Sequence, residues 1–516
     1  MDGAIMKALG VAALAILGLI GSARAADVSL PTTKPAVPAP TNCFASAWTY
    51  LDSTAADCPL TYGPFTVYAT LDAGLMYNTN GAPWNPAFVN GTQGLISKQS
   101  YGSKWLWSPN NINQSVIGIK VSQPIAYGWS LVGTLEAGFD PLSGWLANSQ
   151  RAQVINNGKG QILQSANGDS SRAGQWDNSQ GFLGVSNKTY GTLTFGRVNA
   201  LSLDALIAYD AMGAAYAFSP FGFTGAYAGF SDTELARSNT AFKYRGEYSN
   251  FRLAGLALVG GYNIGNGSSQ MWQGQVGADF PNLYGGTLSL DAIGSYAKDG
   301  VNTSLFTGTC AVLKTGPFAG QTGCTDAIPK YYNADDLKAT LSNNTGFMLV
   351  GKYKWGPWQL FGGWEYFRQA NPSDDYPNGF KTIAGYNVPG NILDSKIFPT
   401  VWVTTNAYNV NRVENIFWTG VKYAVNDRLD VIGAFYYIEQ NNFLAAPAVC
   451  TGTGIHISSA NCAGSYDTLS FLVDYRPLKR IDLYAGVALS NVYGGLANGY
   501  LAAQNIDPTL GVRIKF

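Results

Sequence analysis

The chain has 516 residues with 32 basic and 32 acidic side chains, so its formal net charge is zero. Charged residues make up 12% of the sequence, against roughly 25% in an average soluble domain, and no basic stripe is present. We therefore exclude nucleic acid as an expected partner. The 61 glycines, the aromatic fraction of 13% and the near-zero mean hydropathy instead indicate β structure with one apolar and one polar face.

The N-terminus predicts an export signal. Lys7 is followed by an apolar run over residues 8–20, and the small residues Ala23 and Ala25 come next. This order is typical of a secretory signal. We expect residues 1–25 to be removed, and the alternative of an uncleaved membrane anchor is weaker because the apolar run is too short to span a bilayer as a helix.

Residues 26–63 form a Pro-rich leader that ends in a segment bounded by two cysteines. The six cysteines of the chain fall into three close pairs: Cys43 and Cys58, Cys310 and Cys324, Cys450 and Cys462. Adjacent pairing would give three local disulfides in an oxidising compartment, each stabilising by about 3 kcal/mol. Other connectivities stay open. A zinc site is excluded because His456 is the only histidine and no Cys-x-x-Cys spacing occurs, so we expect no metal or cofactor.

From residue 64 to the C-terminus, the sequence alternates between apolar and small or polar residues in segments longer than an average strand. Segments of this length suit tilted strands that cross a membrane. We predict sixteen of them: 64–77, 113–124, 129–139, 178–188, 190–198, 237–248, 251–262, 270–280, 286–297, 343–354, 358–369, 412–424, 428–440, 465–476, 480–490 and 508–516.

The connections between these segments alternate between tight turns and long loops. Turns such as "SNKTYGT" and "KWGPW" are short, whereas 140–177, 298–342 and 370–411 are long. A soluble β-sandwich has no reason to place its long loops at one end. Since only helices and closed barrels satisfy the backbone in hydrocarbon, the pattern predicts an antiparallel barrel of sixteen strands over residues 64–516 in a bacterial outer membrane.

Aromatic residues and the last strand fit this interpretation. The chain ends in "DPTLGVRIKF", where one face is apolar and the other carries Arg513 and Lys515. We expect the apolar face to meet lipid and the two cations to face the lumen or the rim. Aromatic side chains near the turns predict girdles at the membrane interface: Trp129, Trp355, Trp358, Tyr366, Tyr436 and Tyr437.

Three stretches carry a resemblance to a known family. "YGTLTFGRVNALSLDALIAYDAM", "RSNTAFKYRGEYSNFRLAGLALVGGY" and the terminal "VRIKF" resemble the trimeric general porins of Gram-negative outer membranes, and the leader is similar to that of α-proteobacterial porins. The resemblance implies a homotrimer in lipid and lipopolysaccharide, inserted by the barrel assembly machinery. It also implies passive diffusion of ions and small hydrophilic solutes.

In that family, the loop after the fifth strand folds into the lumen and sets the constriction. Here this loop is 198–236, which is dense in alanine, glycine and aromatic residues. The resemblance implies that its acids line the pore: Asp204, Asp210, Asp232 and Glu234. The enteric motif "PEFGG" is replaced by "SPFGF", so no acid follows Pro220 and the ion preference stays open. For each acid, the alternative is a solvated loop charge.

Basic residues on the wall are the expected counterparts of these acids. Arg197 and Arg237 match family arginines by motif, and the other candidates have lumen-facing parity: Lys120, Lys243 and Arg245. Arg197 shares parity with apolar residues, so it reaches the lumen only if the strand ends or bulges there.

Three functional alternatives to a general pore remain. The first is a solute-selective channel with a saturable site formed by the aromatic residues of the inward loop. The second is an outer-membrane hydrolase, which is disfavoured because the chain has one histidine and no G-x-S-x-G, phosphate-loop or H-E-x-x-H motif. The third is an adhesin with a plugged barrel. We therefore do not expect an enzyme.

Overall fold

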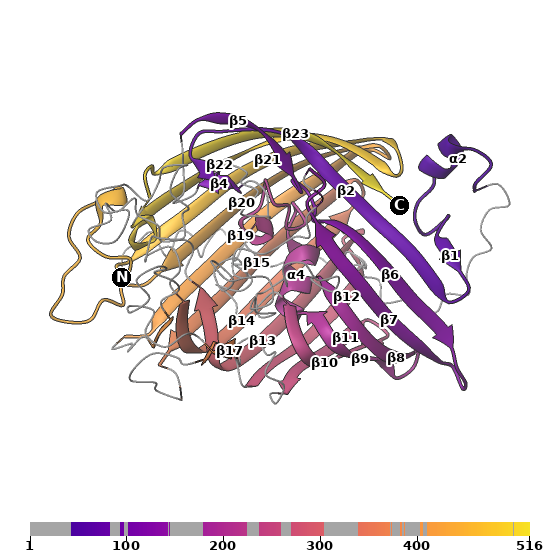
Figure 1. Ribbon diagram of the computed structural model, residues 1–516, viewed down its shortest axis with the longest axis horizontal. Helices are drawn as coiled ribbons and strands as arrows, with labels where there is room; N and C mark the ends of the chain where they lie inside the picture. The colour runs from indigo at the N-terminus through magenta and orange to yellow at the C-terminus, as the bar shows by residue number, and fades with distance from the viewer. Residues whose placement is uncertain are drawn as a thin grey trace.

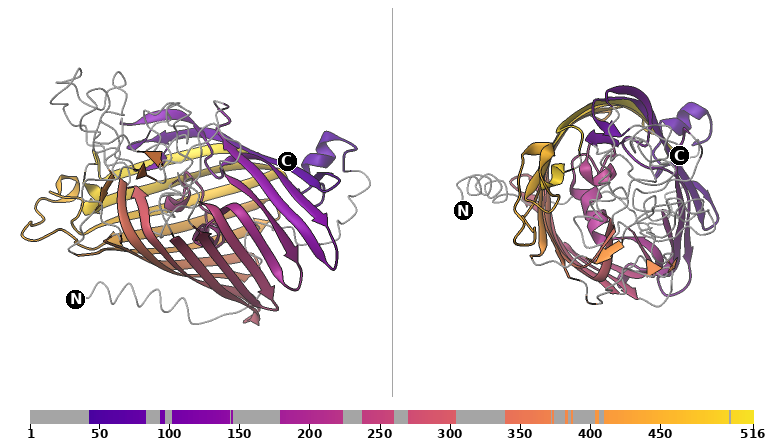
Figure 2. Two further views of the ribbon diagram at one scale, coloured as in Figure 1. Left: turned by 60° about the horizontal axis from the view of Figure 1, so that its bottom comes forward. Right: turned by 60° about the vertical axis from the view of Figure 1, so that its left-hand side comes forward.

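The computed structural model of the protein consists of one large sheet, mostly antiparallel, that closes into a barrel (Figures 1 and 2). It describes residues 43–82, 93–96, 102–142, 144, 179–223, 237–259, 270–303, 339–371, 373, 382–383, 386–387, 403–405, 410–498 and 500–516.

Nineteen strands belong to this sheet, of which β1, β5 and β18 are short additions. The remaining sixteen form the barrel, and β23 pairs with β2 to close it, from Thr70 opposite Lys515 to Met76 opposite Thr509. The wall strands are β2 (Phe65–Asn78), β6 (Ser115–Pro124), β7 (Trp129–Phe139), β8 (Gln180–Asn187), β9 (Gly191–Asn199), β10 (Arg237–Tyr248), β11 (Phe251–Val259), β12 (Gln270–Leu283), β13 (Gly286–Thr303), β14 (Ala339–Trp355), β15 (Trp358–Ala370), β19 (Arg412–Asn426), β20 (Leu429–Gln440), β21 (Gly464–Leu478), β22 (Ile481–Gly494) and β23 (Gln504–Lys515).

The predicted fold class is thereby confirmed, and each predicted segment corresponds to one wall strand. The largest differences lie where strands run on toward the long loops, as in β13, which continues to Thr303, and β23, which begins at Gln504. Polar residues on both faces hide the alternation in these extensions. No helix among the described residues is long and apolar enough to cross a membrane.

The two ends of the barrel differ. At one end, named here the short-turn end, β7 begins four residues after Ile125, and in the turn between β6 and β7 both Tyr127 and Gly128 have positive φ (52° and 76°). The opposite end, the long-loop end, bears the long connections and the short strands β16 (Thr382–Ile383), β17 (Tyr386–Asn387) and β18 (Val403–Thr405). The arrangement matches the alternation of connections predicted above.

One strand of the wall is interrupted, which the alternation did not predict. β5 (Lys104–Pro109) pairs with the C-terminal half of β2, and β6 pairs with the N-terminal half of β2. β5 and β6 are therefore one wall strand that is interrupted by an insertion at 110–114. The insertion is polar, with three asparagines and a glutamine. It turns into the barrel, where Asp72 accepts hydrogen bonds from its backbone, as described below.

The leader forms a small disulfide-bonded unit at the short-turn end, named here the clasp (residues 43–62). It contains α2 (Ala47–Leu51), the Cys43–Cys58 disulfide and β1 (Leu60–Tyr62), which pairs with the projecting start of β2. Figure 1 shows α2 beyond the strand ends, near the C-terminus.

Arg480 holds the clasp to the barrel. This arginine from the β21–β22 turn is buried, and its guanidinium donates to the backbone oxygens of Tyr50 (3.0 Å), Thr54 (3.0 Å) and Cys58 (2.7 Å). The guanidinium also lies 4.0 Å from the Tyr50 ring centroid. Because the strands of a closed barrel are staggered, β23 does not reach the start of β2. β1 of the clasp pairs with that start and fills the place that β23 leaves open.

Loops at the long-loop end also carry short elements. The Cys450–Cys462 disulfide closes a loop that contains η4 (Gly454–His456), so His456 lies in a loop at this end. The short strands β3 (Gly81–Ala82) and β4 (Gln93–Ile96) fold inward, and the backbone of Ile96 donates to Ser490 Oγ (2.8 Å). Two of the three predicted disulfides are thus confirmed. Cys310 and Cys324 lie outside the described residues.

Burial follows the strand period. On β23, Leu510 (53% exposed) and Val512 (37%) are exposed on the outer face, whereas Asp507 and Thr509 are buried on the inner face. A barrel with an apolar exterior and polar interior reverses the burial pattern of a soluble protein. The buried core therefore lies inside the barrel, around the loop described next.

Candidate functional site

The loop after β9 enters the lumen as the helix α4 (Leu201–Tyr209), which Figures 1 and 2 show inside the ring of strands. Every residue of α4 except Ile207 is buried. A helix that is apolar on all sides is expected where protein surrounds it. The helix therefore lies against the wall, and its sequence "LSLDALIAY" is explained by this burial.

The N-terminal end of α4 is fixed by side chains of β10 and β12. Gln273 accepts a hydrogen bond from the backbone N–H of Leu201 (2.6 Å) and donates to Ser202 Oγ (3.1 Å). The Asp204 carboxylate forms ion pairs with Lys243 and Arg245. Burial by itself would raise the pKa of Asp204, but these two cations outweigh it and hold the pKa below its usual range.

The C-terminal end of α4 is fixed by the neighbouring wall. The Tyr209 hydroxyl donates to Asp291, which also pairs with Arg252 (3.0 Å). Lys352 donates to the backbone oxygen of Ala208 (3.1 Å), where a cation complements the negative end of the helix dipole. Trp418 Nε1 donates to the backbone oxygen of Tyr209 (3.0 Å). Both ends of α4 are thus attached to the barrel.

Beyond α4, the loop crosses to β19–β22. Asp210 is buried and accepts a hydrogen bond from the Tyr436 hydroxyl (2.6 Å), and its burial raises its pKa. Phe221, in α5 (Pro220–Phe223), packs edge-on against Trp418 (5.0 Å between centroids) and Tyr436 (5.3 Å). Tyr436 is therefore a lumen residue, and its prediction as a girdle residue was wrong because it shares parity with inward-facing Ile438.

The loop tip is attached at two further points. The backbone oxygen of Phe218 accepts from Ser470 Oγ (2.6 Å), and the Phe218 ring occupies the space left by Gly486, where a Cβ would lie 2.7 Å from its Cε1. Ala217 donates through its backbone to the oxygen of Asn111 in the 110–114 insertion (2.8 Å). The inward loop thus bridges opposite parts of the wall and narrows the lumen.

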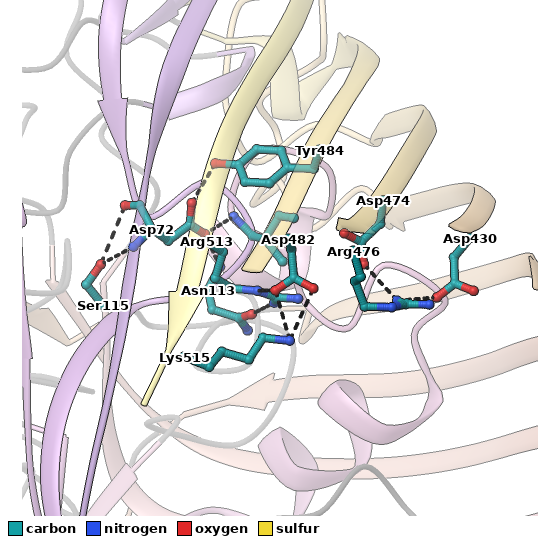
Figure 3. Close-up of polar contacts among 11 residues, drawn as sticks. Asp72, Asn113, Ser115, Asp430, Asp474, Arg476, Asp482, Tyr484, Arg513 and Lys515 are labelled. Carbon is teal, nitrogen blue, oxygen red and sulfur yellow. Dashed lines mark hydrogen bonds and ion pairs between the residues drawn. The ribbon is translucent and has the colours of Figure 1, made fainter. Parts of the chain in front are cut away.

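The insertion is itself held at the barrel seam, where the first and last strands meet (Figure 3). Asp72 on β2 accepts from the backbones of Ile112 (2.7 Å) and Asn113 (2.8 Å) and from the Tyr484 hydroxyl (2.5 Å). Arg513 on β23 donates to Asn113 and lies in register with Asp72. Closure of the barrel therefore positions the support of the inward loop.

A row of acidic and basic residues, named here the charged ladder, lines the lumen beside the seam (Figure 3). Asp430 and Asp474 are direct cross-strand neighbours, and Arg476 pairs with both, at 2.7 and 3.2 Å. Asp482 pairs with Arg513 (2.7 Å). The ladder consists of Lys422, Asp430, Asp474, Arg476, Asp482, Arg513 and Lys515.

The structure places the predicted basic wall residues in different parts of the wall. Lys243 and Arg245 contact the loop through Asp204, whereas Lys120 lies over the Tyr68 ring (4.8 Å), in the part of the wall next to the seam. Arg197 is buried at the end of β9, where the alternation of exposure ends at Gly196 (φ 138°).

Arg237 opens β10 opposite Asn199, and a bulge follows it between Ser238 and Ala241. The described structure thus brings Asp204 together with two predicted cations on one side of the lumen. Asp210 lies apart from them, against β20. Asp232 and Glu234 lie outside the described residues.

Sequence reasoning missed several residues of this arrangement. Asp72, Arg252, Asp291 and the acids of the ladder were not predicted. Their signal was present, since each has lumen-facing parity within a predicted strand. Parity alone does not distinguish a pore-lining charge from one that holds a loop.

Comparisons with known proteins agree with this architecture. A sequence model of Gram-negative porins matches residues 13–393, and no curated protein sequence matches the chain. Among solved structures, the anion-selective porin from Comamonas acidovorans is similar, with a TM-score of 0.50 and 13% identity over 88% of this chain and 99% of that chain. OmpT, an outer membrane protein of Vibrio cholerae, has a TM-score of 0.49 and 14% identity over 89% of this chain and 100% of its own.

At such identities, the structural likeness concerns the fold alone. The sequence match is independent of it and covers most of the chain, including the inward loop and the strands β10, β12, β13 and β14 that contact α4. The closed barrel with a loop fixed inside its lumen is the architecture that this match leads one to expect. The chain belongs to the family of Gram-negative porins.

Proposed function

We propose that the protein is a general diffusion porin, with a constriction formed by the inward loop and selection by size and charge. As a Gram-negative porin it is an outer-membrane channel for passive diffusion of solutes. The observation that carries the proposal is the attachment of α4 at both ends, which makes a fixed constriction rather than a mobile plug. Such a channel couples to no energy source and needs no catalytic group.

Planar-bilayer recordings of the refolded protein test this proposal. We expect discrete conductance steps that grow linearly with salt concentration and do not saturate with small sugars or amino acids. A current that one solute blocks at micromolar concentration would favour the solute-selective alternative, because a narrow aromatic site binds and saturates. Folded barrels that conduct nothing would refute the channel and favour a plugged adhesin.

The assembled form is part of the proposal. We infer a homotrimer embedded in lipid and lipopolysaccharide and inserted by the barrel assembly machinery. A solved structure of the similar Vibrio cholerae OmpT is described as a trimer form. Chemical cross-linking of the detergent-extracted protein should give a ladder that ends at three copies, and a ladder that ends at one copy would contradict this inference.

Processing and the third disulfide complete the proposal. Residues 1–25 act as the signal, 26–63 as the leader and 64–516 as the barrel. Mass spectrometry of the exported protein should find Ala26 as the first residue. The same measurement under non-reducing digestion should find Cys310 joined to Cys324.

A further inference from the structure

We propose that the lumen prefers small anions, and that the charged ladder creates this preference at the short-turn end. The inference rests on the proposed channel function and adds its substrate class. It is carried by an asymmetry in the ladder, whose cations face water while its acids are covered by protein.

The ladder lies on the inner face of five consecutive strands, β19 to β23. Inner-face position follows from register and burial, since Asp430 alternates with outward Val431 and shares its face with Ile432, Ala434 and Tyr436. Its members lie close to the turns that join these strands, so the ladder borders the short-turn mouth of the lumen. Solutes that use the channel pass this border.

Exposure of the side chains separates the two signs of charge. The acids are covered: Asp430 is 3% exposed, Asp474 9% and Asp482 0%. The cations are more accessible, with Lys515 at 37%, Lys422 at 27%, Arg476 at 22% and Arg513 at 13%. Every ion pair of the ladder therefore presents its positive partner to the lumen.

This arrangement produces a positive field although the ladder is nearly balanced in formal charge. A carboxylate behind the wall surface is farther from a passing ion than the ammonium or guanidinium in front of it, and Coulomb energy falls with distance. Arg476 uses only Nη1 in its two described ion pairs. Its remaining N–H groups have the fork geometry that suits oxyanions such as carboxylates and phosphate.

The opposite wall shows the same tendency with exceptions. Arg245 is 31% exposed where its partner Asp204 is 8% exposed. Arg252 and Asp279 are comparable, at 16% and 24%, and Glu247 at the end of β10 is exposed. The two loop acids in the described structure, Asp204 and Asp210, are both buried. Neither supplies the cation-attracting surface that a loop acid would give if it faced the pore.

Reversal potentials across a potassium chloride gradient test the inference. We expect the wild-type channel to pass chloride better than potassium. The variant Lys422→Gln/Lys515→Gln should lower the chloride-to-potassium permeability ratio about twofold toward unity, as expected when the field of a charged cleft is weakened. Folding should survive, because Asp430 keeps Arg476 and Asp482 keeps Arg513 as partners.

The matched control is Lys188→Gln/Lys479→Gln, which removes two exposed lysines from turns at the same end and changes the net charge equally. Its permeability ratio should stay at the wild-type value. A cation-preferring wild type, or a ratio that both double variants lower equally, would overturn the inference while leaving the channel intact. Absence of any conductance would instead refute the proposed function, so the two failures are distinguishable.

Discussion

At the residue scale, Arg513 lies between two buried acids at the barrel seam. It is in register with Asp72 on one side and Asp482 on the other, and both acids are fully buried. Arg513→Gln removes the charge that faces them. Because breaking a buried pair leaves uncompensated charge, we expect a loss of about 3–5 kcal/mol in unfolding free energy. The temperature at which the folded band disappears in semi-native electrophoresis measures this loss.

The exposed Lys188 supplies the control for that experiment. Lys188→Gln should leave the unfolding temperature unchanged, since exposed charges contribute little. An Arg513→Gln barrel that unfolds with the wild type would show that the seam does not depend on this arginine.

Also at this scale, Gly486 leaves the space into which Phe218 packs. In Gly486→Ala, the new methyl group would lie 2.7 Å from the Phe218 ring and 2.5 Å from the Phe471 backbone oxygen, so the ring and the loop tip must shift. We expect a changed single-channel conductance. Gly294→Ala is the matched control, because a Cβ there meets nothing within 4 Å. Identical conductance in both variants would argue against contact of the tip with this wall.

At the scale of elements, the attachment of α4 depends on protonation of Asp204. The folded state lowers the pKa of Asp204 below its ordinary value of 3.8. Above pH 3.8 the carboxylate is charged, and its ion pairs stabilise the loop fully. This stabilisation is lost as the pH falls through the pKa that Asp204 has in the folded protein. We expect frequent closures in wild-type recordings below pH 3.8.

The variant Asp204→Asn should show such closures already at neutral pH, because Lys243 then lacks its charged partner. The pH dependence of closure should be reduced in this variant. If Asp204→Asn closed no more often than the wild type at neutral pH, the ion pairs would not hold the loop open.

The clasp is the second element with a testable attachment. Arg480→Gln removes three hydrogen bonds to clasp carbonyls, each worth about 1 kcal/mol. We expect faster chymotrypsin cleavage after Tyr50, with the barrel still folded. Lys479→Gln, one residue earlier and exposed, should cleave like the wild type. Equal cleavage of all three proteins would mean that the clasp is held by β1 and the disulfide alone.

At the scale of the whole molecule, the ion preference should depend on ionic strength. The Debye length falls from about 10 Å at 0.1 M salt to about 3 Å at 1 M. A preference created by wall charges should therefore weaken as the salt of both compartments rises at a constant gradient. Reversal potentials at several mean concentrations measure this, and a preference that stays constant would point to a narrow binding site instead.

The sequence by itself determined the barrel. A period of two places residues on one face or the other through local geometry alone, so the strands, the outward Leu510 and the inward Arg513 followed from "DPTLGVRIKF" and similar stretches. Composition marked 198–236 as a loop unlike its neighbours, because a loop packed inside protein needs apolar residues. The interruption at 110–114 was missed because a polar insertion looks the same as the end of a strand.

Only the tertiary structure decided which charges meet. Parity places Lys243, Arg252 and Asp291 toward the lumen, but it carries no information on depth or on contacts between distant strands. Barrel closure sets these through register, which brings Arg513 beside Asp72 across 441 positions of the chain. The covering of acids behind cations likewise depends on how side chains pack around a closed wall, and no local pattern contains it.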